Sequence, residues 1–169
     1  MSDDLFFKAE FFLRRALYKA EEATYMLSRS KFLESIMVSR ESMHLSVKVL
    51  YLLITGKEIK GDKVSENELN DILERSPKEF KQAGVARLAI IFRLWRIVDE
   101  FPLPNLGVDH EILFKEEDAE LALKHARECY NIVSYVMETL KKYEQNSQFA
   151  IIYEAPSRED GYLDLMMVN

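Results

Sequence analysis

The stretch "SRESMHLSVKVLYLL", residues 39–53, carries small or apolar residues around most of a helix. At 100° of rotation per residue, these residues leave only one narrow polar sector. The polar sector consists of Arg40, Glu41, His44 and Lys48. A helix enclosed in this way is typical of the centre of a bundle or of a subunit interface. We therefore predict a central helix over residues 31–55 that ends at Gly56, a common helix-stopping residue.

Two long amphipathic helices are predicted on either side of this segment. In each, apolar or small residues recur at steps of three and four, which places them on one face of a helix. The first row is Leu5, Ala9, Phe12, Ala16, Ala20, Ala23 and Leu27. The second row is Ala122, Ala126, Cys129, Val133, Val136, Leu140 and Tyr143. The second helix is expected to begin near Glu116, in an acidic turn that suits the positive end of its dipole.

Shorter helices are predicted between residues 65 and 100. "SENE" places Ser65 three residues before Glu68, and "SPKE" places Ser76 three before Glu79; both have the spacing of a capping box. Gly84 lies inside the second of these helical segments, where glycine costs about 1 kcal/mol relative to alanine. It indicates a close helix contact or a local bend. "FPLPNLGVD", residues 101–109, then ends the pattern, because two prolines stop a helix.

The C-terminal residues have a different pattern. "FAIIYEA" (149–155) and "GYLDLMMV" (161–168) flank "PSRED", which predicts two strands joined by a turn. A hairpin alone is marginally stable in water, so we expect it to pack on the bundle or on a second subunit, with disorder as the alternative. The predicted organisation is a helical bundle over residues 1–146 and a β-hairpin-like extension over 147–169.

Composition restricts the class of protein. With 169 residues, 48% of them hydrophobic, the chain is expected to form one domain with a substantial core. A net charge of −6 argues against a general nucleic-acid coat, although a local basic row could still bind one nucleotide. The single cysteine, Cys129, excludes a disulfide framework. No apolar run approaches the roughly 20 residues that cross a bilayer, and no export signal is present, so we expect a cytoplasmic protein without a membrane segment.

The alanine-spaced opening helix and three segments after it, in order, resemble the HEPN domain over about residues 5–140. The three later segments are "SMHLSVKVLYLLITGKEI" (42–59), "DEFPLP" (99–104) and "LFKEEDAELALKHARECYNIV" (113–133). The resemblance implies an all-α, antiparallel up-and-down bundle of four to five helices that is usually dimeric. Members of the family include metal-independent ribonucleases, toxins paired with nucleotidyltransferase antitoxins, and non-catalytic binding subunits.

The ribonuclease branch of the family carries an arginine and, four to six residues further on, a histidine. Arg96 lies near the expected place, but Phe101, Pro102 and Leu103 stand where the histidine should fall. None of these side chains can transfer a proton. His110 is too far along the chain to match. The motif is therefore absent, and we predict no catalytic residue.

Arg40, His44 and Lys48 follow one another at four-residue intervals, so they could point three donors at one phosphate. Together with Arg96 they are the predicted phosphate ligands. Two alternatives remain open: a solvated sector whose charge Glu41 partly offsets, and catalysis by the same row. Glu41-x-x-His44 is also half of a di-iron signature, but the second half is missing, so no metal or cofactor is predicted.

These observations predict a non-catalytic module that binds a nucleotide or another protein, with a nucleotidyltransferase as one partner and a nucleotide or RNA as ligand. The alternatives are a toxin-like, metal-independent ribonuclease with an atypical site and a purely structural oligomerisation protein. We predict a homodimer, because the central helix has more apolar faces than a monomer easily covers.

Overall fold

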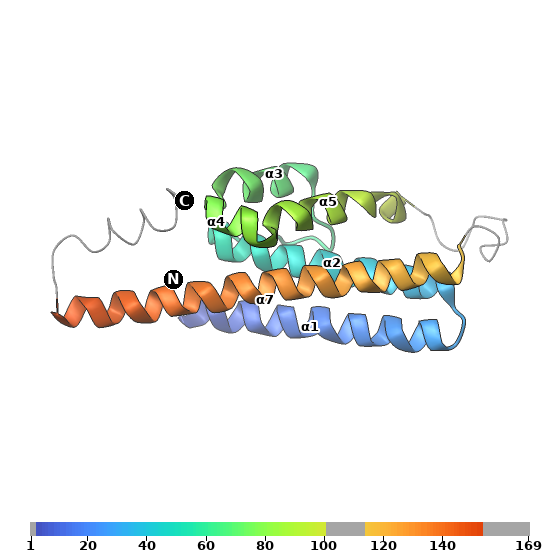
Figure 1. Ribbon diagram of the computed structural model, residues 1–169, viewed down its shortest axis with the longest axis horizontal. Coiled ribbons are helices and arrows are strands. Elements are labelled where there is room, and N and C mark those ends of the chain that lie inside the picture. Colours follow the sequence, from blue (N-terminus) through green and yellow to red (C-terminus); the bar gives the residue numbers. More distant parts are fainter. Residues whose placement is uncertain (1–2, 101–113, 154–169) are drawn as a thin grey trace.

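The computed structural model describes residues 3–100 and 114–153, and side chains as far as residue 146. Its regular elements within these ranges are all helical, which confirms the predicted all-α class. Three long helices lie side by side, and shorter helices cover one face of them (Figure 1). The long helices are α1 (Asp3–Ser28), α2 (Phe32–Thr55) and α7 (Glu116–Tyr153). The shorter ones are α3 (Glu66–Arg75), α4 (Lys78–Phe80), the π-helical turn η1 (Lys81–Val85), α5 (Ala86–Leu94) and the 3₁₀ helix η2 (Arg96–Glu100).

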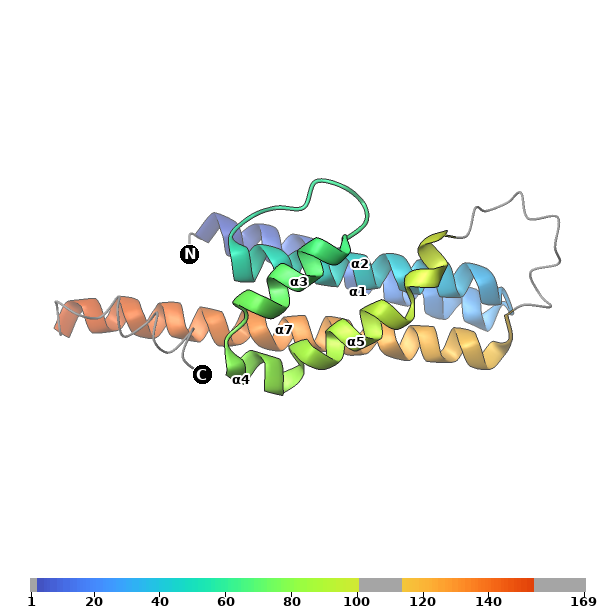
Figure 2. The ribbon, with the colours of Figure 1, turned by 90° about the horizontal axis from the view of Figure 1, so that it is seen from above.

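Helices α1, α2, α5 and α7 alternate in direction. A short turn joins α1 to α2, so these two helices are antiparallel, and α7 begins near that turn and runs in the same direction as α2 (Figure 1). The loop after α2 returns along the helix before α3 begins, and α5 then runs opposite to α2 and α7 (Figure 2). Helices α1, α2, α5 and α7 therefore form the antiparallel, up-and-down arrangement that the sequence predicted.

Small residues bring α1 and α2 close together. Ala16 and Ala23 of α1 are fully buried against α2. The hydroxyl of Ser42 donates to the Ala16 carbonyl at 2.7 Å, and the hydroxyl of Ser35 donates to the Ala23 carbonyl at 2.8 Å. Neither alanine nor serine holds the backbones apart, so polar side chains of one helix reach the backbone of the other.

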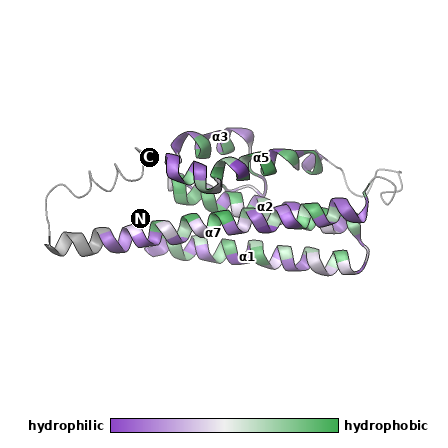
Figure 3. Ribbon diagram, in the orientation of Figure 1, coloured by the Kyte–Doolittle hydropathy of each residue, from purple (hydrophilic) through white to green (hydrophobic). Residues whose placement is uncertain are grey.

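Helix α2 lies at the centre, as predicted, and fifteen of its 24 residues are buried. It packs against α1, α7 and α3 of the same chain. Hydrophobic and hydrophilic residues alternate along each of the long helices, as expected for amphipathic elements (Figure 3). Because the apolar faces of α2 are covered within one chain, they no longer supply a reason for a dimer, and the homodimer stays a prediction.

Gly84 produces both of the features expected of it. Its φ of 156° lies outside the range that residues with a Cβ adopt readily, and it breaks the helical path between α4 and α5. A Cβ at this position would lie 2.8 Å from Cγ1 of Ile132 on α7. The absence of a side chain therefore permits both the bend and the close approach of α7.

One of the two predicted capping boxes is present and the other is wrong. The Ser65 hydroxyl accepts the Glu68 N–H at 3.2 Å, and the Glu68 carboxylate accepts the Ser65 N–H at 2.8 Å. Ser76 instead donates to the Ile72 carbonyl at 2.5 Å, at the C-terminal end of α3. Because α3 and α4 follow each other almost directly, Ser76 ends one helix and does not cap the next.

The predicted hairpin is not supported. Helix α7 continues to Tyr153, so residues 149–153 are helical and the first predicted strand is wrong over that range. No glycine or proline lies between Glu116 and Pro156, and each added helical residue gains a backbone hydrogen bond. The turn and the second strand, residues 156–168, lie outside the described residues. In the part of the chain that is described, no helix is long and apolar enough to cross a membrane.

Candidate functional site

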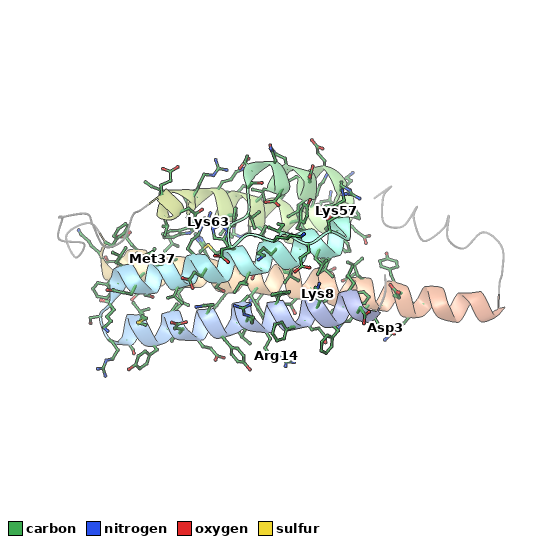
Figure 4. All side chains as sticks on the ribbon, turned by 180° about the vertical axis from the view of Figure 1, so that it is seen from behind. Asp3, Lys8, Arg14, Met37, Lys57 and Lys63 are labelled. Atoms are coloured by element: carbon green, nitrogen blue, oxygen red, sulfur yellow. The ribbon has the colours of Figure 1, made fainter. Side chains whose placement is uncertain are left out.

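A pocket of about 450 Å³ follows the polar sector of α2. It lies where α1, α2, the loop after α2 and η2 meet; Figure 4 labels Met37 and Lys63 among the residues of its wall. Its lining is formed by Arg15, Lys19, Met37, Arg40, Glu41, His44, Leu45, Lys48, Asp62, Lys63, Val98 and Asp99. Basic side chains outnumber acidic ones in this wall.

Arg40 is held in the wall by two elements that follow far along the chain. Its Nε and Nη2 donate to the two carboxylate oxygens of Asp99 at 2.9 and 2.8 Å. Its Nη1 donates to the Phe92 carbonyl at 2.8 Å, and the guanidinium lies 4.0 Å from the centre of the Phe92 ring. Only 3% of Arg40 is exposed. Such a planar, bidentate pair orients both partners firmly.

Both ring nitrogens of His44 have partners in the protein. The Val64 N–H donates to Nδ1 at 3.0 Å, so this nitrogen carries a lone pair and we assign the proton to Nε2. Nε2 then donates to the Asp99 carboxylate at 2.9 Å. Burial lowers the pKa of His44, an effect that the hydrogen bond to Asp99 opposes without reversing. His44 is therefore a neutral imidazole at neutral pH.

Asp99 links these groups. Burial alone would raise the pKa of its carboxyl group, but the hydrogen bonds from Arg40 and His44 outweigh burial and hold that pKa well below its usual range. The ammonium group of Lys63 donates to the Asp99 backbone carbonyl at 2.8 Å. Asp99 therefore stays ionised and ties η2 to α2 and to the loop before α3.

The HEPN domain family model matches residues 9–142, most of the chain. The chain belongs to the HEPN family. This confirms the resemblance that the sequence segments indicated. No curated protein and no solved structure matches the chain.

In this HEPN domain, Arg40, His44 and Lys48 line the same pocket. Their role as phosphate ligands stays a prediction. The alternative of a solvated sector is wrong for Arg40 and His44, of which only 3% and 4% are exposed. It failed because η2 covers that part of α2. Lys48 is half-buried, and its ammonium group lies 5.9 Å from the centre of the Phe12 ring. Glu41 does offset positive charge, but that of Lys19, at 2.9 Å.

Arg96 is not brought to this pocket. It lies exposed on η2 and forms an ion pair with Glu66 of α3, which also binds Arg93. The structure therefore separates it from the three other predicted phosphate ligands. The pocket residues that sequence reasoning missed include Arg15, Lys63 and Asp99. For Asp99 a signal existed, because a cation enclosed on an otherwise apolar helix needs an anion, and "DEFPLP" begins with that residue.

The other residues of the HEPN domain with reactive side chains, Cys129 and His125, are engaged in packing and hydrogen bonding. Burial raises the pKa of Cys129 to about 12, so its thiol stays protonated. His125 accepts the indole N–H of Trp95 on Nδ1 at 2.9 Å. Among the described residues no three His, Cys, Asp or Glu side chains are grouped to hold a metal ion. His110 lies outside the described residues.

Proposed function

We propose that this HEPN domain is a non-catalytic module that binds a phosphate-bearing ligand, a nucleotide or an RNA end, in the pocket along α2. The observation that carries the first half of the proposal is the pairing of His44. A general base needs a free lone pair within reach of the proton that it takes. The lone pair on Nδ1 is occupied by the Val64 N–H, and Nε2 is directed at Asp99. Arg40 is likewise committed to Asp99 and Phe92.

The second half rests on the cations that remain. Arg15 of α1 and Lys48 of α2 line the pocket and, among the described residues, have no carboxylate within ion-pair distance. Lys63 contributes a third positive charge and is bonded only to a backbone carbonyl in the described part of the chain. Lys and Arg side chains bind phosphate through charge-assisted hydrogen bonds. A pocket of this volume is within the range that accommodates small molecules.

Calorimetric titration with ATP, GTP and a short RNA tests the proposal. Lys48→Ala and Arg15→Ala are each expected to weaken binding about tenfold or more, since each removes a charged hydrogen bond. Lys57→Ala is the matched control: it removes the same charge from an exposed residue at the end of α2, away from the pocket (Figure 4). Equal binding by wild type and Lys48→Ala, or no binding to any of the three ligands, would reject the pocket as the site.

The proposal includes a partner protein. Some members of the HEPN family act beside nucleotidyltransferases, so we propose a nucleotidyltransferase encoded next to this chain as a binding partner. Co-expression of the two, with the HEPN domain carrying an affinity tag, should give a complex that survives gel filtration. Separate elution of the two proteins would remove the partner from the proposal without affecting the ligand titration.

A further inference from the structure

Helix α5 and η2 carry an exposed aliphatic row on their outer side. Ile90, Leu94 and Ile97 are 68%, 58% and 59% exposed. They stand four and three residues apart, a spacing that places side chains on one side of a helix. Helices α1 and α5 lie on opposite sides of α2 and α7 (Figure 1). The row is therefore open to solvent on the side of the bundle away from α1.

Leu121 of α7 extends this row. It is exposed, and it stands about one and two helical turns before His125 and Glu128, on the same side of α7. These two residues reach α5 and its end: His125 accepts the indole N–H of Trp95 at 2.9 Å, and the Glu128 carboxylate pairs with Arg87 at 2.7 Å. The side of α7 that carries Leu121 therefore borders α5. We call Ile90, Leu94, Ile97 and Leu121 together the α5 face.

The charges around the α5 face are basic. Residues 81–98 contain four basic residues and no acidic one, in a chain whose net charge is −6. Arg93 and Arg96 share one carboxylate, that of Glu66, so this group has an excess positive charge. These ion pairs, like that of Arg87, are exposed to solvent, and exposed ion pairs contribute little to stability. The arginines can therefore turn to the carboxylates of another molecule.

We propose that the α5 face binds an acidic amphipathic helix of a different protein, with aliphatic side chains on the row and carboxylates against the arginines. The regular elements of the described chain are all helical, so a partner docks through side chains and does not add a strand to a sheet. A helix offers aliphatic side chains at the same spacing of three and four residues. A nucleic acid fits less well, because its bases stack on aromatic rings and this row is aliphatic.

Charge selects a different protein over a second copy of this chain. In a two-fold interface the same patch is used twice, so it must complement itself. Pairing two α5 faces would set the arginines of each chain against a surface that is also basic, and like charges across an interface oppose association. A partner with glutamate or aspartate beside its apolar stripe meets the arginines with opposite charge. The α5 face is also separate from the pocket along α2, whose lining includes none of its four residues.

Fluorescence anisotropy with the full chain and two labelled synthetic peptides tests this surface. Both peptides are helices of about 20 residues, with leucines at steps of three and four and alanine at the other apolar positions. One carries glutamate on its polar side and the other carries lysine, and circular dichroism checks that they are equally helical. The acidic peptide should bind with a Kd of about 1 to 100 µM, since a single helix gives an interface at the small end of specific ones. The basic peptide should bind at least about tenfold more weakly.

Two variants test the residues of the surface. Leu94→Asp places a charge in the middle of the aliphatic row and should weaken binding of the acidic peptide about tenfold or more. Arg93→Gln removes one positive charge and should weaken the acidic peptide about threefold or more, without weakening the basic one. Phe11→Asp and Arg14→Gln are the matched controls on the exposed side of α1, and each should leave the Kd within about twofold of wild type. All four residues are exposed, and a thermal melt confirms that each variant is folded.

Four results would overturn the inference. An acidic peptide that does not bind up to about 500 µM, or two peptides with equal dissociation constants, would show that the face does not select an acidic helix. Equal binding of the acidic peptide by wild type and Leu94→Asp would place the peptide on another surface. A wild-type dimer in sedimentation velocity that Leu94→Asp dissociates would assign the face to a second copy. A short RNA that competes with the acidic peptide would assign the face to nucleic acid.

Discussion

Asp99 and Arg40, 59 residues apart in the chain, form a bidentate ion pair at the junction of η2 and α2. Arg40 is almost completely buried, and 15% of the Asp99 side chain is exposed. The same carboxylate accepts a hydrogen bond from the proton-bearing nitrogen of His44. One carboxylate therefore determines how two of the predicted phosphate ligands are oriented, and it occupies hydrogen-bond donors of both.

Asp99→Asn should destabilise the fold by about 3 kcal/mol, because it leaves the buried charge of Arg40 without its counter-ion. Urea unfolding of both proteins, with equal m-values, measures the difference. Glu100→Gln removes the same charge from an exposed neighbour and should change the free energy of unfolding by less than about 0.5 kcal/mol. Similar decreases in the free energy of unfolding in both variants would show that the ion pair does not stabilise the fold more than an exposed charge does.

Stability should fall as the pH decreases from about 7 towards 5. The unfolded chain protonates His44 near pH 6.5, whereas burial lowers the pKa of His44 in the folded protein. The unfolded state thus binds more protons in this range, and stability decreases with decreasing pH by at most about 1.4 kcal/mol per pH unit for this residue. His125, whose pKa burial also lowers, adds to the slope in the same direction.

Urea unfolding at several pH values measures this slope. His44→Gln should flatten it, because glutamine does not titrate, and His125→Gln should remove the other contribution. A slope that both variants retain would contradict the assignment. Below about pH 4 a second loss is expected, since the pKa of Asp99 is depressed in the folded protein and its stabilisation disappears as acid protonates it.

Gly84→Ala should destabilise the protein by about 2 to 4 kcal/mol, through backbone strain and overlap with Ile132. Combining it with Ile132→Ala should relieve the steric overlap but leave the backbone strain. A double-mutant cycle therefore separates the two effects on the free energy of unfolding. Gly61→Ala is the control, because its new Cβ would meet nothing closer than 3.9 Å. A Gly84→Ala variant as stable as Gly61→Ala would show that the bend does not depend on glycine.

The purified HEPN domain should not cleave labelled RNA in the presence of chelator. His44 lacks a free nitrogen, and Arg96 is paired with Glu66. Any trace cleavage from contaminants should persist equally in His44→Ala and Arg96→Ala preparations made in the same way. Cleavage by wild type that either variant loses would establish a ribonuclease and reject the non-catalytic proposal.

Helix positions could be predicted from the sequence wherever a local pattern was long. The rows of α1 and α7 and the enclosed surface of α2 repeat over six or more turns, and the capping box at Ser65 involves residues only three apart. Short or ambiguous patterns failed. Residues 149–153 are apolar enough for a strand, but they continue a helix that was already formed.

The sequence by itself determined the class of fold and the order of helices, because these depend on periodicity along the chain, and the resemblance of its segments indicated the family. Only the tertiary structure decided what becomes of the polar sector of α2. A charged row can face water, a ligand or a buried counter-ion, and the row alone does not distinguish these environments. The packing of η2 onto α2 gives Arg40 and His44 a buried counter-ion, Asp99, and leaves Lys48 in the lining of the pocket. That contact joins residues distant in sequence, and burial makes the loss of either partner costly, because a buried charge would then have no counter-ion.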